Sequence, residues 1–255
     1  MKKSVMPLVI AGILLGAGAQ AQVFEVIHPD IEKGGFEFES LNGLTLSDVA
    51  PGDERSAHEL AFSYAPVSWW KPTVALEIAN PKGANAEVEA FEFENVFLMP
   101  GGGGHAHDHG HGDELHVLPG LFLGMELPNA AGINAAEISV GPVLEVAHGP
   151  WLAIGNLFVD IPFEDGTDPG LSYAFSVARG VGSDWRLGVE MFGSFEQAFG
   201  DAPALDQQQH VIGPAAYTSF DLGHGRVIEP RIAILAGLTD AAPDAVLSFN
   251  VELKF

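Results

Sequence analysis

The 255-residue sequence has no cysteine, few basic residues and, after its first 21 residues, no long apolar run. The lack of cysteine excludes structural disulfides and thiolate metal sites. There are only 11 Lys or Arg against 34 Asp or Glu, a net charge of −23, so nucleic acid is not an expected partner. Without a second apolar run, a membrane-spanning form of this chain would have to be a closed β-barrel, because only helices and barrels satisfy their backbone polar groups in lipid.

The first 21 residues have the three parts of a secretory signal peptide. Lys2 and Lys3 precede an apolar run at 5–17, and Ala19-Gln20-Ala21 forms a small-x-small cleavage site. The apolar run is shorter than the roughly 20 residues that a spanning helix needs. We therefore expect residues 1–21 to be removed on export and residues 22–255 to form one domain.

The last ten residues alternate between apolar and polar side chains, which places the two kinds on opposite faces of a strand. The apolar face is Leu247, Phe249, Val251, Leu253 and Phe255, and the polar face is Ser248, Asn250, Glu252 and Lys254. This ending resembles the closing strand of Gram-negative outer-membrane β-barrels, which ends on an aromatic residue read by the barrel-assembly machinery. The resemblance implies that this machinery is a partner and that Phe249, Val251, Leu253 and Phe255 form the assembly signal.

The same two-faced pattern recurs along the chain and predicts about twelve strands, an even number as bacterial barrels usually have. The expected strands are Gly35–Leu41, Arg55–Tyr64, Pro72–Asn80, Ala86–Leu98, Leu115–Leu127, Ala135–Ala147, Pro150–Ile161, Gly170–Gly180, Asp184–Phe195, Gln209–Leu222, Arg226–Gly237 and Asp244–Phe255. In 86–98 the parity of the glutamates changes between Glu89 and Glu92, and a β-bulge there would restore one polar face. The predicted fold is all-β, an antiparallel up-and-down transmembrane barrel.

The joins between these strands alternate in length. Those expected at the periplasmic end include 148–149, 182–183 and 223–225, whereas the opposite joins at 42–54, 162–169 and 196–208 are longer. All four tryptophans, Trp69, Trp70, Trp151 and Trp185, fall at the expected periplasmic end. Tryptophan favours the membrane interface, so this common level predicts an aromatic girdle.

One expected periplasmic join, 100–116, is long and rich in Gly and His. Closely spaced imidazoles with interleaved carboxylates can share one ion, and such tracts bind zinc, copper or nickel. The candidate ligands are His105, His107, His109, His111, His116, Asp108 and Asp113. The alternative is a solvated low-complexity turn with adventitious affinity, since a Gly-rich backbone is the opposite of a preorganised site.

Charged residues on the polar parity of the strands are expected to point into the barrel. The candidate lumen-lining residues are Glu59, Glu77, Glu94, Glu137, Glu145, Arg186, Glu190, Glu229, Arg231, Glu252 and Lys254. In a barrel of about a dozen strands they would either line a narrow path or interlock as an ion-pair network that fills the lumen.

No pattern supports an enzyme. There is no G-x-S-x-G motif, and no paired Ser and His in neighbouring strands stands out. Gly101–Gly104 is not followed by the Lys-Ser or Lys-Thr of a phosphate-binding loop. We therefore predict a protein that is not an enzyme and requires no cofactor, apart from the zinc, copper or nickel that the His-rich join could bind.

Residues 22–255 resemble small transporter-like outer-membrane barrels that include the phenol-degradation-pathway family. The resemblance rests on the signal peptide, the final strand and hairpin joins such as 182–186, and it implies passage of small molecules. We therefore predict a barrel in the cell outer membrane, in contact with its lipid, for binding or passage of small solutes or metal cations. The alternatives are a soluble periplasmic β-protein that buffers metal and a structural barrel without transport.

Overall fold

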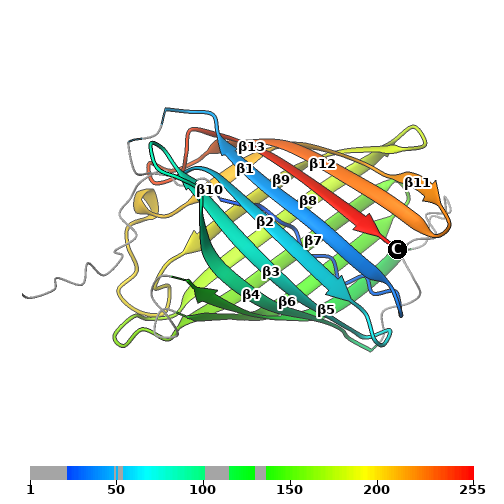
Figure 1. Ribbon diagram of the computed structural model, residues 1–255, viewed down its shortest axis with the longest axis horizontal. Coiled ribbons are helices and arrows are strands. Elements are labelled where there is room, and N and C mark those ends of the chain that lie inside the picture. The colour runs from blue at the N-terminus through cyan, green and yellow to red at the C-terminus, as the bar shows by residue number, and fades with distance from the viewer. Residues whose placement is uncertain (1–21, 49, 51–53, 101–114, 130–135) are drawn as a thin grey trace, which may run out of the picture.

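The computed structural model describes residues 22–48, 50, 54–100, 115–129 and 136–255. They form a closed antiparallel barrel of twelve strands (Figure 1). The strands are β1 (Phe36–Thr45), β2 (Glu54–Tyr64), β3 (Trp70–Pro81), β4 (Glu87–Leu98), β5 (Leu115–Pro128), β6 (Glu137–His148), β7 (Trp151–Pro162), β8 (Gly170–Val181), β9 (Trp185–Phe195), β10 (His210–Thr218), β11 (Phe220–Gly223), β12 (Arg226–Gly237) and β13 (Ala245–Lys254). β10 and β11 both pair with β12 and act as one strand interrupted at Ser219.

The barrel closes where β13 pairs with β1. Phe36 and Phe255 exchange backbone hydrogen bonds of 2.8 and 2.9 Å, and their rings stack at 5.8 Å. Each of the other strands pairs with its neighbours in sequence, so the topology is the predicted up-and-down meander. We call the end that holds Phe36 and Phe255 the terminal end and the opposite end the loop end. Within the described ranges, no helix is long and apolar enough to cross a membrane.

The predicted strands are confirmed, with small shifts at their ends. The largest shift is in β1, which runs to Thr45 instead of ending at Leu41. Asn42 and Gly43 suggest a turn, but the Asn42 side chain donates to the Phe249 carbonyl of β13 (2.8 Å). Gly43 pairs with both neighbouring strands, and the position requires glycine because a Cβ there would collide with the backbone of Gln22.

The predicted bulge in β4 is also confirmed. Glu77 of β3 pairs with Ala90, and the next residue, Ile78, pairs with Val88, so Glu89 is the extra residue. Glu87 is thereby brought to the same face of β4 as Glu92 and the rest of the inward set.

The outer face of the barrel is apolar. Side chains that alternate with the inward residues are exposed, for example Phe62 (43%), Phe175 (44%) and Val189 (49%). The inner face combines small residues such as Ala57 and Ala61 with polar and charged ones. This inside-out distribution is the reverse of a soluble β-domain, and a lipid-facing barrel requires it.

The two ends differ as predicted. Joins at the terminal end include the tight turns 149–150, 182–184 and 224–225, whereas the loop end carries 163–169 and 196–209. Trp69, Trp151 and Trp185 lie at the terminal end with about half of their surface exposed (55%, 50% and 50%). Trp69 and Trp70 also stack on Phe97, each at 6.5 Å. They make an aromatic level at that end.

Candidate functional site in the barrel lumen

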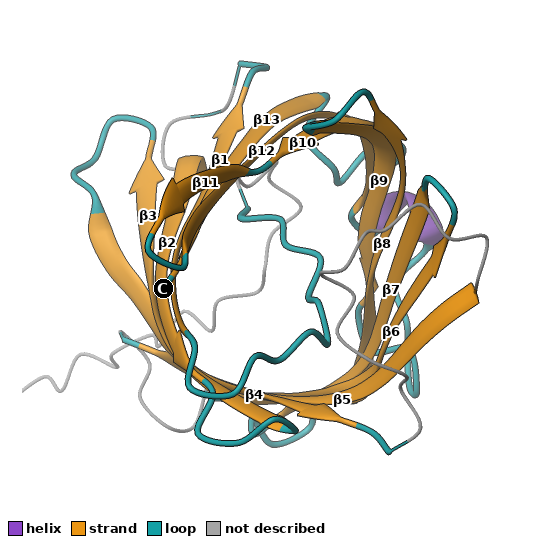
Figure 2. Ribbon diagram, turned by 90° about the vertical axis from the view of Figure 1, so that its right-hand side faces the viewer, coloured by secondary structure: helices purple, strands orange, loops and turns teal. Residues whose placement is uncertain are grey.

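Residues 22–34, which precede β1, run through the interior of the barrel, and we call them the lumen segment (Figure 2). The backbone of Ile27 donates to Asn156 Oδ1 (2.8 Å), and the Asn156 amide donates back to the Ile27 carbonyl (2.9 Å). His28 Nδ1 lies 3.1 Å from the Glu145 carboxylate. Asn156 is fully buried, and this pairing satisfies both its side-chain amide and the backbone of Ile27, which lies in a segment with no strand partner.

Two hydrophobic clusters seat the lumen segment. Phe24 packs in the first cluster, its ring 5.0 Å from that of Phe192 on β9. Ile31 is only 2% exposed and packs in the second cluster, with Val96 and Phe122. Apolar side chains at both ends of the segment therefore anchor it to opposite parts of the wall.

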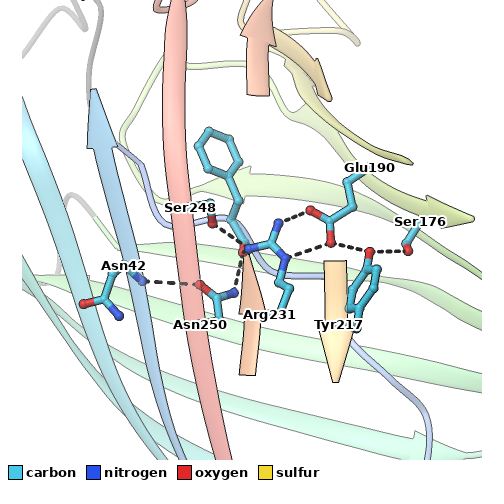
Figure 3. A network of polar contacts seen from close by, with 8 residues as sticks. Asn42, Ser176, Glu190, Tyr217, Arg231, Ser248 and Asn250 are labelled. Atoms are coloured by element: carbon cyan, nitrogen blue, oxygen red, sulfur yellow. Dashed lines mark hydrogen bonds and ion pairs between the residues drawn. The ribbon is translucent and has the colours of Figure 1, made fainter. Parts of the chain in front are cut away.

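A set of polar side chains on β8–β13 holds the same segment, and we call it the arginine network (Figure 3). Arg231 forms an ion pair with Glu190, and both side chains are almost inaccessible to solvent. Its Nη1 donates to the Phe24 carbonyl (3.1 Å) and to Ser248 Oγ (2.5 Å). The Asn250 amide donates to the same Phe24 carbonyl (2.9 Å).

The far side of Glu190 is also satisfied. The Tyr217 hydroxyl donates to Glu190 Oε1 (2.6 Å) and lies 2.8 Å from Ser176 Oγ. A buried carboxylate is tolerated only when its lone pairs meet donors, and here Arg231 and Tyr217 provide them. The charged groups on this side of the lumen therefore stabilise the fold and hold the lumen segment in place.

The other side of the lumen contains a cavity of about 300 Å³ between the lumen segment and β4–β8, which we call the acidic cavity. It is lined by Val23 and Ile27 of the segment and by the wall residues Glu92, Glu94, Phe122, Gly124, Met125, Glu126, Ser139, Phe158 and Ser172. Three carboxylates line this space, and none of its lining residues is basic. Such a space attracts cations and repels anions.

The residues predicted to line the lumen all lie on the face opposite the exposed apolar side chains. The structure brings some of them together: Glu190 pairs with Arg231, and Lys254 Nζ lies 2.7 Å from Glu229 and 3.3 Å from Glu252. Glu94 lines the acidic cavity, and Glu145 contacts the lumen segment through His28. The remaining four, Glu59, Glu77, Glu137 and Arg186, occupy inward positions on β2, β3, β6 and β9.

Carboxylates also gather near the terminal end. One carboxylate oxygen from each of Glu37, Glu39 and Glu252 lies within 4.8 Å of the others, which is a spacing that could hold a cation. Lys71 Nζ already lies 2.5 Å from Glu37, and Lys254 contacts Glu252. Two ammonium groups thus offset part of this negative charge.

The predicted metal ligands of the His-rich join fall mostly outside the described residues. These are His105, His107, His109, His111, Asp108 and Asp113. The described ligand, His116, is an exposed residue near the start of β5, opposite Ala147. Both described ends of the join, Leu98 and Leu115, lie at the terminal end, where the sequence predicts it.

Sequence reasoning missed the lumen segment and, with it, Glu92 and Glu126 as cavity residues. Residues 22–34 show no period-two pattern and so gave no strand. A signal was present in the run Val23–Ile31. It holds several large apolar residues outside any predicted strand, and such residues need a place to be buried, which the barrel interior provides.

No family model matches the chain, and the comparison with curated proteins gives no match. Among solved structures, the chain is similar to the NanC porin, with a TM-score of 0.50, 10% identity, and coverage of 86% of this chain and 98% of that chain. It also aligns with OprD from Pseudomonas aeruginosa (TM-score 0.39, 9% identity, 88% and 65% coverage) and LpxR from Salmonella typhimurium (0.42, 8%, 86% and 99%). At these identities the likeness concerns the fold alone.

This chain is an outer-membrane β-barrel. The closed barrel and its apolar exterior place it in contact with outer-membrane lipid, which excludes the soluble periplasmic alternative. The more specific resemblance to the phenol-degradation-pathway barrels stays a prediction.

Proposed function

We propose that this outer-membrane barrel binds small cationic solutes, including metal cations, and passes them along the acidic side of its lumen. The observation that carries the proposal is the acidic cavity, where Glu92, Glu94 and Glu126 face about 300 Å³ of open space without a basic residue in the lining. Low-dielectric walls around a single sign of charge focus the field and raise the local concentration of cations. The lumen segment narrows the passage, since Val23 and Ile27 form the opposite wall of the cavity.

The test is the ion selectivity of the purified protein in planar lipid bilayers. A KCl gradient should give a reversal potential that favours K⁺, and the triple variant Glu92→Gln, Glu94→Gln, Glu126→Gln should move that potential toward zero. A matched control removes the same charge at the loop end, with Glu164→Gln, Asp165→Asn and Asp168→Asn. If both triple variants shift the potential equally, the net charge sets selectivity and the cavity has no special role.

The structural-barrel alternative is decided by whether the lumen conducts at all. Asn156→Ala removes both hydrogen bonds to Ile27, so the lumen segment should loosen and the single-channel conductance should rise. Deleting residues 22–33 should raise it further. Absence of conductance in the wild type and in both of these variants would leave a barrel without transport.

A further inference from the structure

Three polar side chains on the outer wall of the barrel form a hydrogen-bonded row that the lumen does not use. His58 Nδ1 lies 2.9 Å from Asn42 Oδ1, and His58 Nε2 lies 3.2 Å from Ser56 Oγ. Ser56 and His58 are two residues apart on β2, and Asn42 lies opposite His58 on β1. We call Ser56, His58 and Asn42 the outer-wall triad.

The triad belongs to the lipid-facing side of the wall. Ser56 pairs with Leu44 of β1, and Leu60 follows His58 at the next outward position of β2. Leu44 and Leu60 are 37% and 41% exposed, whereas the intervening Ala57 and Ala61 are buried in the interior. Because strand side chains alternate, Ser56 and His58 point outward with these leucines.

Contacts of Asn42 decide which ring nitrogen of His58 carries the proton. The Asn42 amide nitrogen donates to the carbonyl oxygens of Phe249 (2.8 Å) and Ser40 (3.2 Å), so its Oδ1 must be the atom that faces His58. Oδ1 can only accept, and His58 Nδ1 is therefore the protonated nitrogen. The unprotonated Nε2 is left to accept the hydroxyl proton of Ser56, which is the arrangement of a nucleophile, its general base and an orienting group.

Asn42 is held from the interior as well. Its backbone N–H donates to Asn250 Oδ1 (3.4 Å), and the Asn250 amide binds the Phe24 carbonyl of the lumen segment (Figure 3). The orienting residue is thus tied to the arginine network through the wall, which gives the triad a rigid support.

A fourth side chain supplies a donor beside the nucleophile. Asn80 of β3 pairs with Ser56, and its amide nitrogen lies 3.4 Å from Ser56 Oγ. A side-chain amide in this position can donate to the negative oxygen that develops when a hydroxyl attacks a carbonyl.

We propose that the outer-wall triad hydrolyses carboxylic acyl esters of membrane lipids. The surroundings select this substrate class: Leu44, Leu60 and Phe249 (43% exposed) form an apolar surface for acyl chains. Ser56 lies two residues from the loop-end start of β2, roughly 7 Å along the strand at about 3.3 Å per residue. We place this position at the interface between acyl chains and headgroups, where a lipid carries its ester carbonyl.

The reaction balances without a cofactor. Ser56 Oγ attacks the ester carbonyl carbon while its proton passes to His58 Nε2. The bond between the carbonyl carbon and the alkoxy oxygen then breaks, the leaving alkoxide takes the proton from His58, and the acyl group stays on Ser56. Water, deprotonated by His58, attacks this acyl ester, and His58 returns the proton to Ser56 as the fatty acid leaves.

The test uses the full-length barrel folded in detergent, with p-nitrophenyl octanoate as the probe ester. Ser56→Ala and His58→Ala should each lower hydrolysis by about 10⁴-fold or to background. Ser63→Ala is the matched control, because Ser63 is on the same strand but points inward and bonds Thr73 (2.8 Å). It should hydrolyse the probe like the wild type. Heat-modifiable gel migration verifies that each variant is folded.

A fluorophosphonate should label Ser56 in the wild type, and peptide mass spectrometry would identify the labelled residue. The Ser56→Ala variant should carry no label. Ser56 is 7% exposed, so this label also measures whether a reagent can reach its hydroxyl from the membrane side. Two further assays use phosphatidylethanolamine or lipopolysaccharide in mixed micelles and measure the fatty acid that is released. They show whether the triad hydrolyses glycerol esters or the esters of lipid A. No labelling of Ser56, or equal hydrolysis by wild type and Ser56→Ala, overturns the proposal.

Asn42 is a positioning residue, and its variants separate orientation from folding. Asn42→Ala should lower kcat while KM stays near the wild-type value, because Asn42 does not touch the substrate. Asn42→Asp keeps an acceptor for His58 Nδ1–H and should restore activity, with the pH profile shifted to higher pH by the added negative charge. If Asn42→Ala and Asn42→Asp behave alike in both readouts, the triad has no orienting member and the proposal fails. Channel conductance should be unchanged in Ser56→Ala, which keeps this test separate from that of solute passage.

Discussion

The two sides of the lumen use buried charge in opposite ways. In the arginine network, Glu190 meets Arg231 and Tyr217, and every charge has a partner within hydrogen-bond distance. In the acidic cavity, Glu92, Glu94 and Glu126 share a space that no basic residue lines. The lumen segment lies between the two sides. It bonds to the arginine network through Phe24 and to β7 through Asn156, and it leaves open space beside the three carboxylates of the acidic cavity.

This difference indicates which glutamates hold the barrel together and which are available for a solute. A charge whose partners are fixed protein groups contributes to the folded state and has little left to offer a ligand. Carboxylates without fixed partners are costly for the fold, and their accumulation on one side is the basis of our proposal that this side binds cations.

The largest expected effect comes from breaking the paired side. Arg231→Ala would leave Glu190, 1% exposed, without its cation, and we predict a loss of about 3–5 kcal/mol in the free energy of unfolding. Glu92→Gln on the other side should change the same quantity by less than about 1 kcal/mol, because no fixed ion pair is lost. Urea titration of the barrel in lipid vesicles, followed by tryptophan fluorescence, measures both. Comparable losses would contradict the division of the lumen into a structural and a solute-facing side.

A second prediction compares an arginine placed on the lipid-facing surface with one placed in the acidic cavity. Val189→Arg should destabilise the barrel by about 2–4 kcal/mol if it lies near the bilayer midplane, since Val189 is 49% exposed on the outer wall. Ser172→Arg places the same side chain in the acidic cavity, beside carboxylates, and should cost less. The same vesicle titration gives the two values, and equal costs would mean that the inward and outward assignments of β8 and β9 do not govern stability.

Much of the barrel wall was predictable because apolar and polar residues alternate along most of its strands. Alternation alone located the strands. The change of glutamate parity between Glu89 and Glu92 predicted a bulge in β4, and the strand pairing places it at Glu89. These features depend on residues close in sequence. The terminal alternation also identified the closing strand, and the structure pairs its Phe255 with Phe36 at the seam.

What could not be predicted depends on contacts between distant residues. The lumen segment is fixed by Asn156 and Arg231, which lie more than a hundred residues away in the chain. The outer-wall triad was missed because the predicted first strand ends at Leu41, whereas β1 continues to Thr45 and pairs Asn42 with His58. The available signal was that Asn42, His58 and Asn80 each occupy an otherwise apolar outward position near the loop end of a strand.

A smaller change in folding free energy is predicted at the seam of β1 and β13, which borders the arginine network. Phe255→Ser removes a ring stacked 5.8 Å from Phe36 and should cost about 1 kcal/mol when the purified barrel refolds in vesicles. In cells the same change should lower the amount of assembled barrel much more, because we expect the terminal aromatic to be the signal for the assembly machinery. Outer-membrane fractionation measures this, and a wild-type level of the variant would refute the signal.

The smallest predicted effect concerns where a metal cation binds first, at the acidic side of the lumen or at the His-rich join. We predict that the segment 105–116 binds zinc or copper with micromolar affinity, because ordering a Gly-rich loop costs about 1–2 kcal/mol per residue fixed. Protons compete for the same imidazoles, so affinity should fall as pH drops through about 6.5, the ordinary pKa of His.

Calorimetry at pH 7.5 and 5.5 on two variants separates these sites. Changing His105, His107, His109 and His111 to Ala should abolish the pH-dependent binding. Changing Glu92, Glu94 and Glu126 to Gln removes the carboxylates of the acidic cavity and should leave that binding intact. If the histidine variant binds as the wild type does while the glutamine variant does not, the metal belongs to the carboxylates of the lumen, and the contrast between its two sides extends to metal cations.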